Sequence, residues 1–206
     1  MLSCQNLTLL HPGLHPEKRT ALFSGLSFSM MPSSSLYIMG PNGIGKTCLL
    51  RTLAGLQKPF SGKITFKNQD LTQMLPSAVN YIQHNLGLTP ELTVMEHLDY
   101  WAKACGGLAA RDAAIFYLNL QEILQSPLAK LSAGNCKKVA ISRLLLSSAP
   151  IWLLDEVEAN LDAKNLELLR GMISAKVASS GLVLMTSHQK PASANAPILN
   201  LMDYLG

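Results

Sequence analysis

Charged residues are scarce in this chain. Asp, Glu, Lys and Arg make up 15% of its 206 residues, whereas about 25% is usual for a globular protein in water. The 17 basic and 13 acidic residues give a formal net charge of +4 and are scattered without long runs of one sign. This balance fits nucleic acid, anionic lipid or polyphosphate equally and selects none of them. The low charge does indicate that part of the surface meets another apolar surface.

Cysteine clusters and long apolar runs are also missing. The four cysteines, Cys4, Cys48, Cys105 and Cys136, form no Cys-x-x-Cys pair and no zinc-like group with the five histidines. Reduced thiols and a cytosolic environment are therefore expected. No apolar run approaches the ~20 residues that span a bilayer, so the chain cannot form a channel alone. A signal peptide is not expected either, because no basic residue precedes the first apolar stretch.

What is present is an alternation of apolar strands and helical patterns. Strands are expected at 26–30, 36–39, 62–66, 79–82, 151–154 and 182–186, and helices at 48–56, 93–105, 109–125, 132–147 and 162–177. Strands that alternate with helices predict an α/β fold with a mainly parallel sheet. The length suits a single domain, 1–206. We expect its core to comprise 1–85 and 131–206, with a small helical subdomain inserted at about 86–130.

A glycine-rich loop lies between the strand at 36–39 and the helix that follows it. It matches the P-loop pattern Gly-x-x-x-x-Gly-Lys-Thr and consists of Gly40, Pro41, Asn42, Gly43, Ile44, Gly45, Lys46 and Thr47. Glycines allow backbone N–H groups to face phosphate oxygens, and the helix N-terminus adds positive potential. Lys46 is expected to reach the β- and γ-phosphates of ATP, and Thr47 to offer its hydroxyl to Mg²⁺. The alternative is a chance glycine-rich turn.

Two acidic residues follow the apolar strand at 151–154. Such a strand delivers Asp155 and Glu156 to the carboxyl edge of the sheet, where the P-loop also lies. Asp155 is expected to hold Mg²⁺ through water, and Glu156 to orient or deprotonate the attacking water. Alternatively, both acids cap the following turn. His188 follows the strand at 182–186 and is expected to project from the same edge towards the γ-phosphate, although lone histidines are more often structural.

The segment 131–135, Leu-Ser-Ala-Gly-Asn, resembles the signature Leu-Ser-Gly-Gly-Gln of ATP-binding cassette (ABC) proteins. In that family the motif opens a helix. The resemblance implies that Ser132 and Gly134 bind the γ-phosphate of ATP held by a second copy, in a head-to-tail homodimer. A helix N-cap at Ser132 is compatible with that role. Ala133 and Asn135 depart from the usual residues, which bears on the rate of hydrolysis more than on binding.

Other segments extend the same resemblance. The stretch 159–162 is similar to the D-loop and His188 to the switch histidine, while Val157 stands where proline is usual. His84 occupies the position usual for the Q-loop glutamine, and Gln83 lies beside it. Either side chain could contact Mg²⁺ or the nucleophilic water indirectly, and a plain loop role is the alternative.

Three longer stretches, 21–28, 81–93 and the end after 186–189, are similar to the cytochrome c biogenesis ATPases of the CcmA family, haem-exporter subunits. The resemblance implies an ABC ATPase fold with N-terminal antiparallel strands, ATP hydrolysis with Mg²⁺, and a separately encoded, polytopic CcmB-like membrane subunit. It also implies a peripheral position on the cytoplasmic face of the inner membrane. ABC ATPases for other cargo share much of this likeness.

Other nucleotide-binding classes fit the sequence less well. ABC ATPases that act on DNA or ribosomes normally carry a coiled-coil insertion or two tandem cassettes, and this chain has neither, so no nucleic acid partner is expected. GTPases read guanine with Asn-Lys-x-Asp, which does not occur here. A non-hydrolysing ABC-type regulator remains an alternative because of the atypical signature and Val157. Haem contact is left to the partner subunit, since the chain has no Cys-x-x-Cys-His motif.

Overall fold

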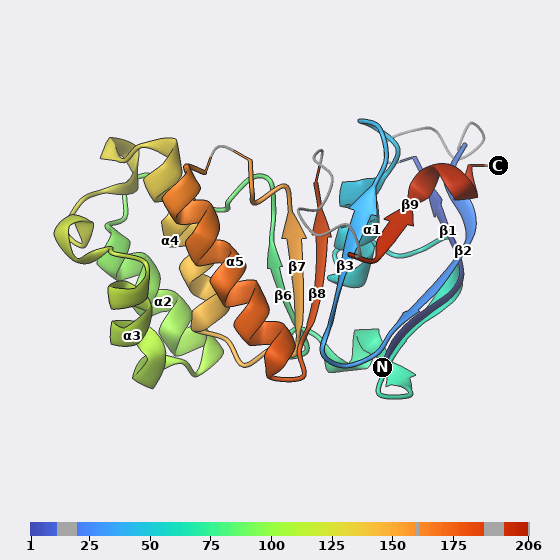
Figure 1. The fold of residues 1–206 in the computed structure, drawn as a ribbon, viewed down its shortest axis with the longest axis horizontal. Helices are drawn as coiled ribbons and strands as arrows, with labels where there is room; N and C mark the ends of the chain where they lie inside the picture. Colours follow the sequence, from blue (N-terminus) through green and yellow to red (C-terminus); the bar gives the residue numbers. More distant parts are fainter. Residues whose placement is uncertain (12–19, 160, 188–195, 206) are drawn as a thin grey trace.

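A five-stranded parallel sheet forms the centre of the computed structural model, which describes residues 1–11, 20–159, 161–187 and 196–205. The strand order is β6 (Val79–Ile82), β7 (Ile151–Asp155), β8 (Leu182–Thr186), β3 (Ser34–Met39) and β9 (Ile198–Asn200). Every residue of β7 and β8 is buried, which explains their unbroken apolar sequences. Their carboxyl ends meet at one edge of the sheet, uppermost in Figure 1.

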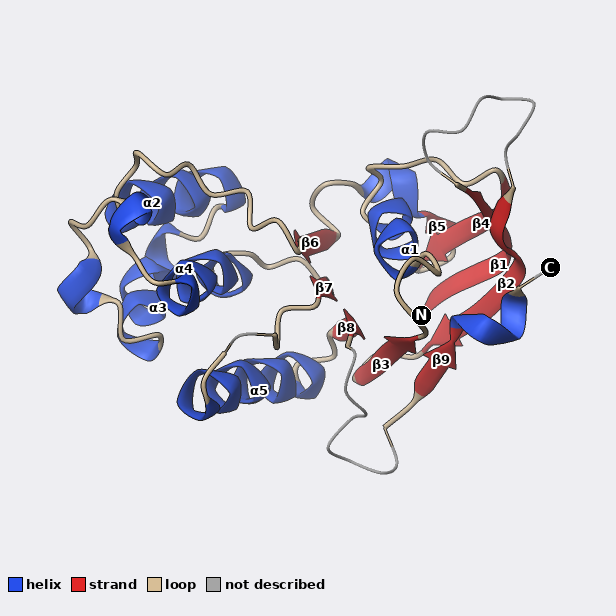
Figure 2. Ribbon diagram, turned by 90° about the horizontal axis from the view of Figure 1, so that it is seen from above, coloured by secondary structure: helices blue, strands red, loops and turns tan. Residues whose placement is uncertain are grey.

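A second, antiparallel sheet is formed by strands from the N-terminal part of the chain. Its order is β2 (Ala21–Met30), β1 (Leu2–Leu10), β4 (Ser61–Phe66) and β5 (Gln69–Asp70). Helix α1 (Lys46–Leu53) lies between the two sheets, as Figure 2 shows. The α/β fold with a mainly parallel sheet and N-terminal antiparallel strands is thus confirmed.

The remaining helices cover the opposite face of the parallel sheet (Figure 2). They are α2 (Val94–Cys105), α3 (Arg111–Tyr117), α4 (Ala133–Leu145) and α5 (Ala163–Ala178). Short 3₁₀ turns occur at Leu71–Met74, Leu108–Ala110, Gln121–Ile123, Leu128–Lys130 and Leu201–Tyr204. Helices α2 and α3 fall within the stretch expected to be an inserted subdomain, and the division of the chain into core and subdomain stays a prediction. No helix in the described ranges is both long and apolar enough to cross a bilayer.

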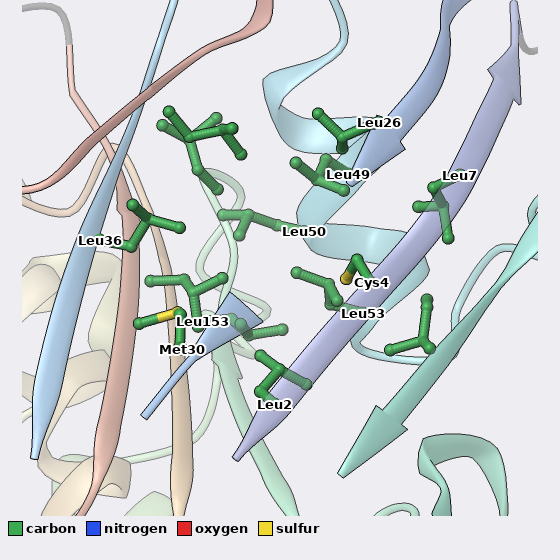
Figure 3. Close-up of a cluster of buried hydrophobic side chains, with 14 of the residues drawn as sticks. Leu2, Cys4, Leu7, Leu26, Met30, Leu36, Leu49, Leu50, Leu53 and Leu153 are labelled. Carbon is green, nitrogen blue, oxygen red and sulfur yellow. The ribbon is translucent and has the colours of Figure 1, made fainter. Parts of the chain in front are cut away.

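The alternation of side chains along the central strands divides the interior into two cores. Ile151 and Leu153 of β7 face α1 and the antiparallel sheet, whereas Trp152 and Leu154 face α2 to α5. Figure 3 shows the first core, where Leu49, Leu50 and Leu53 of α1 meet side chains from both sheets. Full burial of a leucine stabilises the fold by roughly 1.5–3 kcal/mol. The start of α1, and with it the P-loop, is therefore fixed firmly against the sheet.

One expected helix is wrong in extent. The stretch 109–125 forms only the short helix α3 and flanking 3₁₀ turns. The helix ends at Tyr117, and Asn119 adopts a left-handed conformation with a φ of 52°, which asparagine tolerates better than most residues. Leu118 and Leu120 on either side are fully buried. Tertiary burial of these leucines outweighs the helical pattern of the sequence.

Candidate nucleotide-binding site

A cavity of about 620 Å³ opens at the carboxyl edge of the parallel sheet. The P-loop and α1 supply much of its wall, and the ends of β6 and β7 and the N-terminal strands supply the rest. The lining residues are His11, Leu22, Asn42, Gly43, Gly45, Lys46, Thr47, Cys48, Arg51, Tyr81, Gln83, His84, Asn85, Asp155 and Glu156. The structure thus brings the glycine loop and the acidic pair, far apart in sequence, to one cavity.

The P-loop wraps tightly around the start of α1. Gly45 is the N-cap of the helix, with a φ of 112°, and a Cβ atom there would lie 3.2 Å from Cε1 of Phe23. Gly40 has a φ of 147°, and its Cβ would lie 2.9 Å from Cγ2 of Ile44. Both positions therefore require glycine. Gly40, Pro41 and Ile44 shape the loop without lining the cavity, since Ile44 is buried in the core.

Lys46 crosses its own loop. Its Nζ donates hydrogen bonds to the carbonyl oxygens of Gly40, at 2.8 Å, and Pro41, at 3.1 Å. An ammonium group carries three protons, so these two bonds leave one proton for an anion in the cavity. The lysine is only 5% exposed. A cation held in this way beside the N-terminus of a helix makes the cavity suited to phosphate groups.

Asp155 is buried at the end of β7, 1% exposed. Thr186, its register partner on β8, donates from Oγ1 to Oδ1 of Asp155 at 2.8 Å. The hydroxyl of Tyr81 donates to Oδ2 at 3.3 Å. Burial, and then the nearby charge of Asp155 and this hydrogen bond, raise the pKa of Tyr81, so it remains a donor. The carboxylate is thus oriented by two hydroxyl groups.

Thr186 also holds the residue after Asp155. The backbone N–H of Glu156 donates to Oγ1 of Thr186 at 2.9 Å, and Glu156 has a φ of 54°, in the left-handed region. Its side chain turns towards His84, with 3.4 Å between Oε2 of Glu156 and Nδ1 of His84. The second carboxylate therefore depends on a strained backbone turn for its position.

We expect the Thr186→Val variant to lose at least about 2 kcal/mol of free energy of unfolding, because the buried N–H and carboxylate would each lose a partner, at about 1–3 kcal/mol each, without much change of shape. Thr186→Ser keeps the hydroxyl and should cost about 1 kcal/mol for the lost methyl group. Urea unfolding of both variants measures the difference. A valine variant as stable as the serine variant would contradict the role given to this hydroxyl.

An all-oxygen set in this cavity fits Mg²⁺. The hydroxyl of Thr47 and the carboxylate of Asp155 line the same space, and Mg²⁺ prefers such hard oxygen ligands together with water and substrate phosphates. The described residues contain no group of three His, Cys, Asp or Glu side chains that could hold a metal by themselves. A substrate phosphate would therefore have to complete the coordination.

The structure brings some of the other candidates from the sequence to the same cavity and places one elsewhere. Gln83 and His84 both line the cavity, so the structure does not choose between them. Val157, which stands where proline is usual in the family, is buried in the second core. His188 lies outside the described residues, as does part of the D-loop segment 159–162.

The signature segment lies away from the cavity. Ser132 is the N-cap of α4 and accepts a hydrogen bond from the backbone N–H of Asn135 at 3.3 Å. Ser132 is exposed, and neither it nor Gly134 is among the described residues that line the cavity. Helices α4 and α1 lie on opposite sides of β6, β7 and β8 (Figures 1 and 2). Within one chain, the two segments do not meet.

Sequence reasoning missed several lining residues. Tyr81 could have been found, because it lies near the end of a strand that pairs in parallel with β7. His11 could not, because its place depends on the pairing of β1 with β2, where its N–H donates to the carbonyl of Thr20 at 3.0 Å. Arg51 is one turn beyond Thr47 on α1, and Asn85 follows the candidate Q-loop residues.

Comparison with known proteins gives consistent matches. The family model "ABC transporter" matches residues 23–159. A Rickettsia bellii relative named cytochrome c biogenesis ATP-binding export protein CcmA is 42% identical over 87% of this chain and 92% of its own length. A putative ABC transporter ATP-binding protein from Pyrococcus furiosus superposes with a TM-score of 0.83 and 21% identity, covering 100% of this chain and 99% of the other. The dimeric post-hydrolysis structure of the cassette MJ0796, bound to ADP and Pi, has a TM-score of 0.79 and 23% identity, covering 92% and 88%.

Proposed function

Because the chain belongs to the ABC transporter family, among relatives of the CcmA type, we propose that it is the ATP-hydrolysing subunit of a membrane exporter that serves c-type cytochrome assembly. The observation that carries this proposal is the convergence of Lys46, Asp155 and Glu156 on one cavity. A cation and a glycine loop suit a triphosphate, and two acids suit its metal and its nucleophile.

The residues of the cavity divide the work of phosphoryl transfer. The backbone N–H groups of the P-loop residues that line the cavity and the Nζ of Lys46 hold the phosphates. Thr47 and Asp155 would hold Mg²⁺, which neutralises charge on the phosphate oxygens. Glu156 orients a water molecule and accepts its proton as the water oxygen bonds to the γ-phosphorus. The bond from that phosphorus to the bridging oxygen breaks, and ADP leaves with the electron pair.

The base of the nucleotide has its own candidate contacts. His11 and Leu22 line the cavity, and neither has a part in binding phosphate. An imidazole ring beside an apolar side chain is suited to pack against adenine.

His11→Ala should therefore weaken ATP binding about fivefold, whereas His11→Phe should bind ATP nearly as well as the wild type. Titration with a fluorescent ATP analogue measures both affinities. Inorganic triphosphate serves as the control ligand, because it has no base and its affinity should not change. An equal loss for both ligands would contradict the assignment to adenine.

A second copy of the chain completes the site. The signature helix α4 begins on the far side of the sheet from α1, so Ser132 and Gly134 can serve only a nucleotide bound elsewhere. A head-to-tail dimer brings each signature to the P-loop of the other copy. The Ser132 hydroxyl accepts from Asn135, which leaves its own proton to donate to a γ-phosphate.

The exported cargo and its pathway belong to a separate subunit. We propose a polytopic, CcmB-like partner that spans the inner membrane, with this chain bound peripherally on the cytoplasmic face, where ATP is available. Haem, or a step in its delivery, is the proposed cargo. The low charge of the chain supports an apolar contact with such a partner.

Complementation in cells tests the proposed function. In a bacterium that lacks its own CcmA, expression of this chain should restore haem-stained c-type cytochromes, and the Glu156→Gln variant at equal abundance should not. A wild-type chain that hydrolyses ATP but restores no cytochrome would assign the ATPase to another cargo. Restoration by the glutamine variant would show that hydrolysis is not required.

A further inference from the structure

Lys137 joins the signature helix to the loop that carries the second acidic residue. It lies on α4, and its Nζ donates to the carbonyl oxygen of Glu156 at 3.2 Å and to that of Ala159 at 2.5 Å. These carbonyls bracket a turn that is closed by the Ala159 N–H, which donates to the same Glu156 carbonyl at 3.2 Å. One side chain therefore fixes both ends of the turn after β7.

The environment of Lys137 differs from that of a solvated surface lysine. Burial lowers its pKa, and the negative charge of Glu156 acts in the opposite direction. Charge-assisted hydrogen bonds to backbone carbonyls are stronger than neutral ones. The side chain of the next residue, Lys138, makes no hydrogen bond with any residue that the structure describes, although it is also half-buried. The two adjacent lysines thus form a natural comparison.

The backbone of Glu156 is held from two separate elements. Its N–H donates to Thr186 on β8, and its carbonyl accepts from Lys137 on α4. The residue itself has the left-handed φ of 54°, which L-residues other than glycine adopt at a cost. A strained turn keeps one geometry only when its surroundings fix it, and here the lysine supplies one of the contacts that hold it.

We propose that Lys137 is a positioning residue that couples the signature helix to Glu156. This inference rests on the proposed function, in which Ser132 and Gly134 at the start of α4 bind the partner's nucleotide while Glu156 acts on the nucleotide in its own cavity. When the start of α4 binds the phosphate of the partner's nucleotide, α4 is displaced. The side chain of Lys137, about one turn further along the helix, transmits this displacement to the turn after β7. Each of the two composite sites thereby senses whether the other is closed.

The test compares three variants of the full-length chain: Lys137→Met, which keeps the length of the side chain but has no donor, Lys137→Arg, which keeps the cation, and Lys138→Met as the matched control. We expect Lys137→Met to lower kcat about tenfold to hundredfold, because small misplacements of reacting groups have effects of this size. Its affinity for ATP should stay within about twofold of the wild type, because the P-loop is untouched. Lys137→Arg should recover most of the rate, and Lys138→Met should match the wild type.

A positioning role is separated from a structural one by combining variants. In the Glu156→Gln background, Lys137→Met should cause no further loss of the residual rate, because its effect acts through that carboxylate. Urea unfolding shows whether each variant is folded, and Lys137→Leu, which also has no donor, replaces the methionine variant if that one is not. A normal kcat for the folded variant, or an equal loss in both backgrounds, would overturn the coupling alone. A wild-type chain without ATPase activity would overturn the coupling and the proposed function together.

Discussion

ATP binding should be lost when Lys46 is replaced by alanine. The ammonium is the one buried cation of the glycine loop, and hydrogen bonds to charged groups contribute about 1.5–3 kcal/mol each. Two carbonyls of the loop, from Gly40 and Pro41, also lose their donor, so the loop loses part of its shape. We expect affinity to fall at least about a hundredfold.

Equilibrium binding of a fluorescent ATP analogue measures this loss. Lys58→Ala is the matched control, because Lys58 is an exposed lysine shortly after α1 that does not line the cavity. Urea unfolding of both variants separates a lost contact from a lost fold. Unchanged affinity in a folded Lys46→Ala variant would contradict the assignment of the P-loop.

The second large effect concerns hydrolysis. Glu156→Gln keeps the size of the side chain and removes its ability to accept a proton. General-base catalysis contributes about a hundredfold to ten-thousandfold, so phosphate release should fall to about 1% of the wild-type rate or less. ATP binding should persist, because the phosphate contacts lie in 40–47.

The matched control for this change is Glu158→Gln. Glu158 is two residues further along the same loop and is not among the described residues that line the cavity. Its variant should release phosphate at the wild-type rate. Equal, negligible rates in the wild type and both variants would remove the claim of enzymatic activity and favour a regulatory ATP-binding protein.

Local sequence signals predict most of the parallel sheet. The strands at 151–154 and 182–186 appear in the structure because their residues are buried on both faces, which leaves an unbroken apolar pattern. The strand at 79–82 is also present, although Val79 and Tyr81 are only partly buried and Asn80 interrupts its apolar sequence. The helices at 93–105, 132–147 and 162–177 are confirmed with small shifts at their ends, since Thr93, Ser132 and Asp162 each act as an N-cap.

Features that depend on pairing between strands distant in sequence could not be predicted from local sequence signals. Strand β9 pairs with β3 at the edge of the sheet and has only three residues, too few for a pattern. Strand β1 carries register shifts against β2, which interrupt its alternation. The helix expected at 109–125 is shortened by burial of Leu118 and Leu120, a tertiary effect.

In the candidate site, too, some residues could be predicted from local sequence and others could not. Motif spacing identifies 40–47, Asp155 and Glu156, because the chemistry of phosphate and metal demands those residue types at strand ends. The residues that orient them, Thr186 and Lys137, have no local signal. Their roles follow from the register of β7 with β8 and from the packing of α4 against the loop.

Mixing two inactive variants tests most directly whether two copies build one site. Lys46→Ala lacks the P-loop cation, and Ser132→Arg blocks the signature, so each should release almost no phosphate alone. In a head-to-tail dimer of one copy of each, one site combines an intact Lys46 with an intact Ser132. An equal mixture should therefore recover up to about a quarter of the wild-type phosphate release, since half of the dimers are mixed and each has one intact site. A mixture as inactive as its components would contradict the shared site.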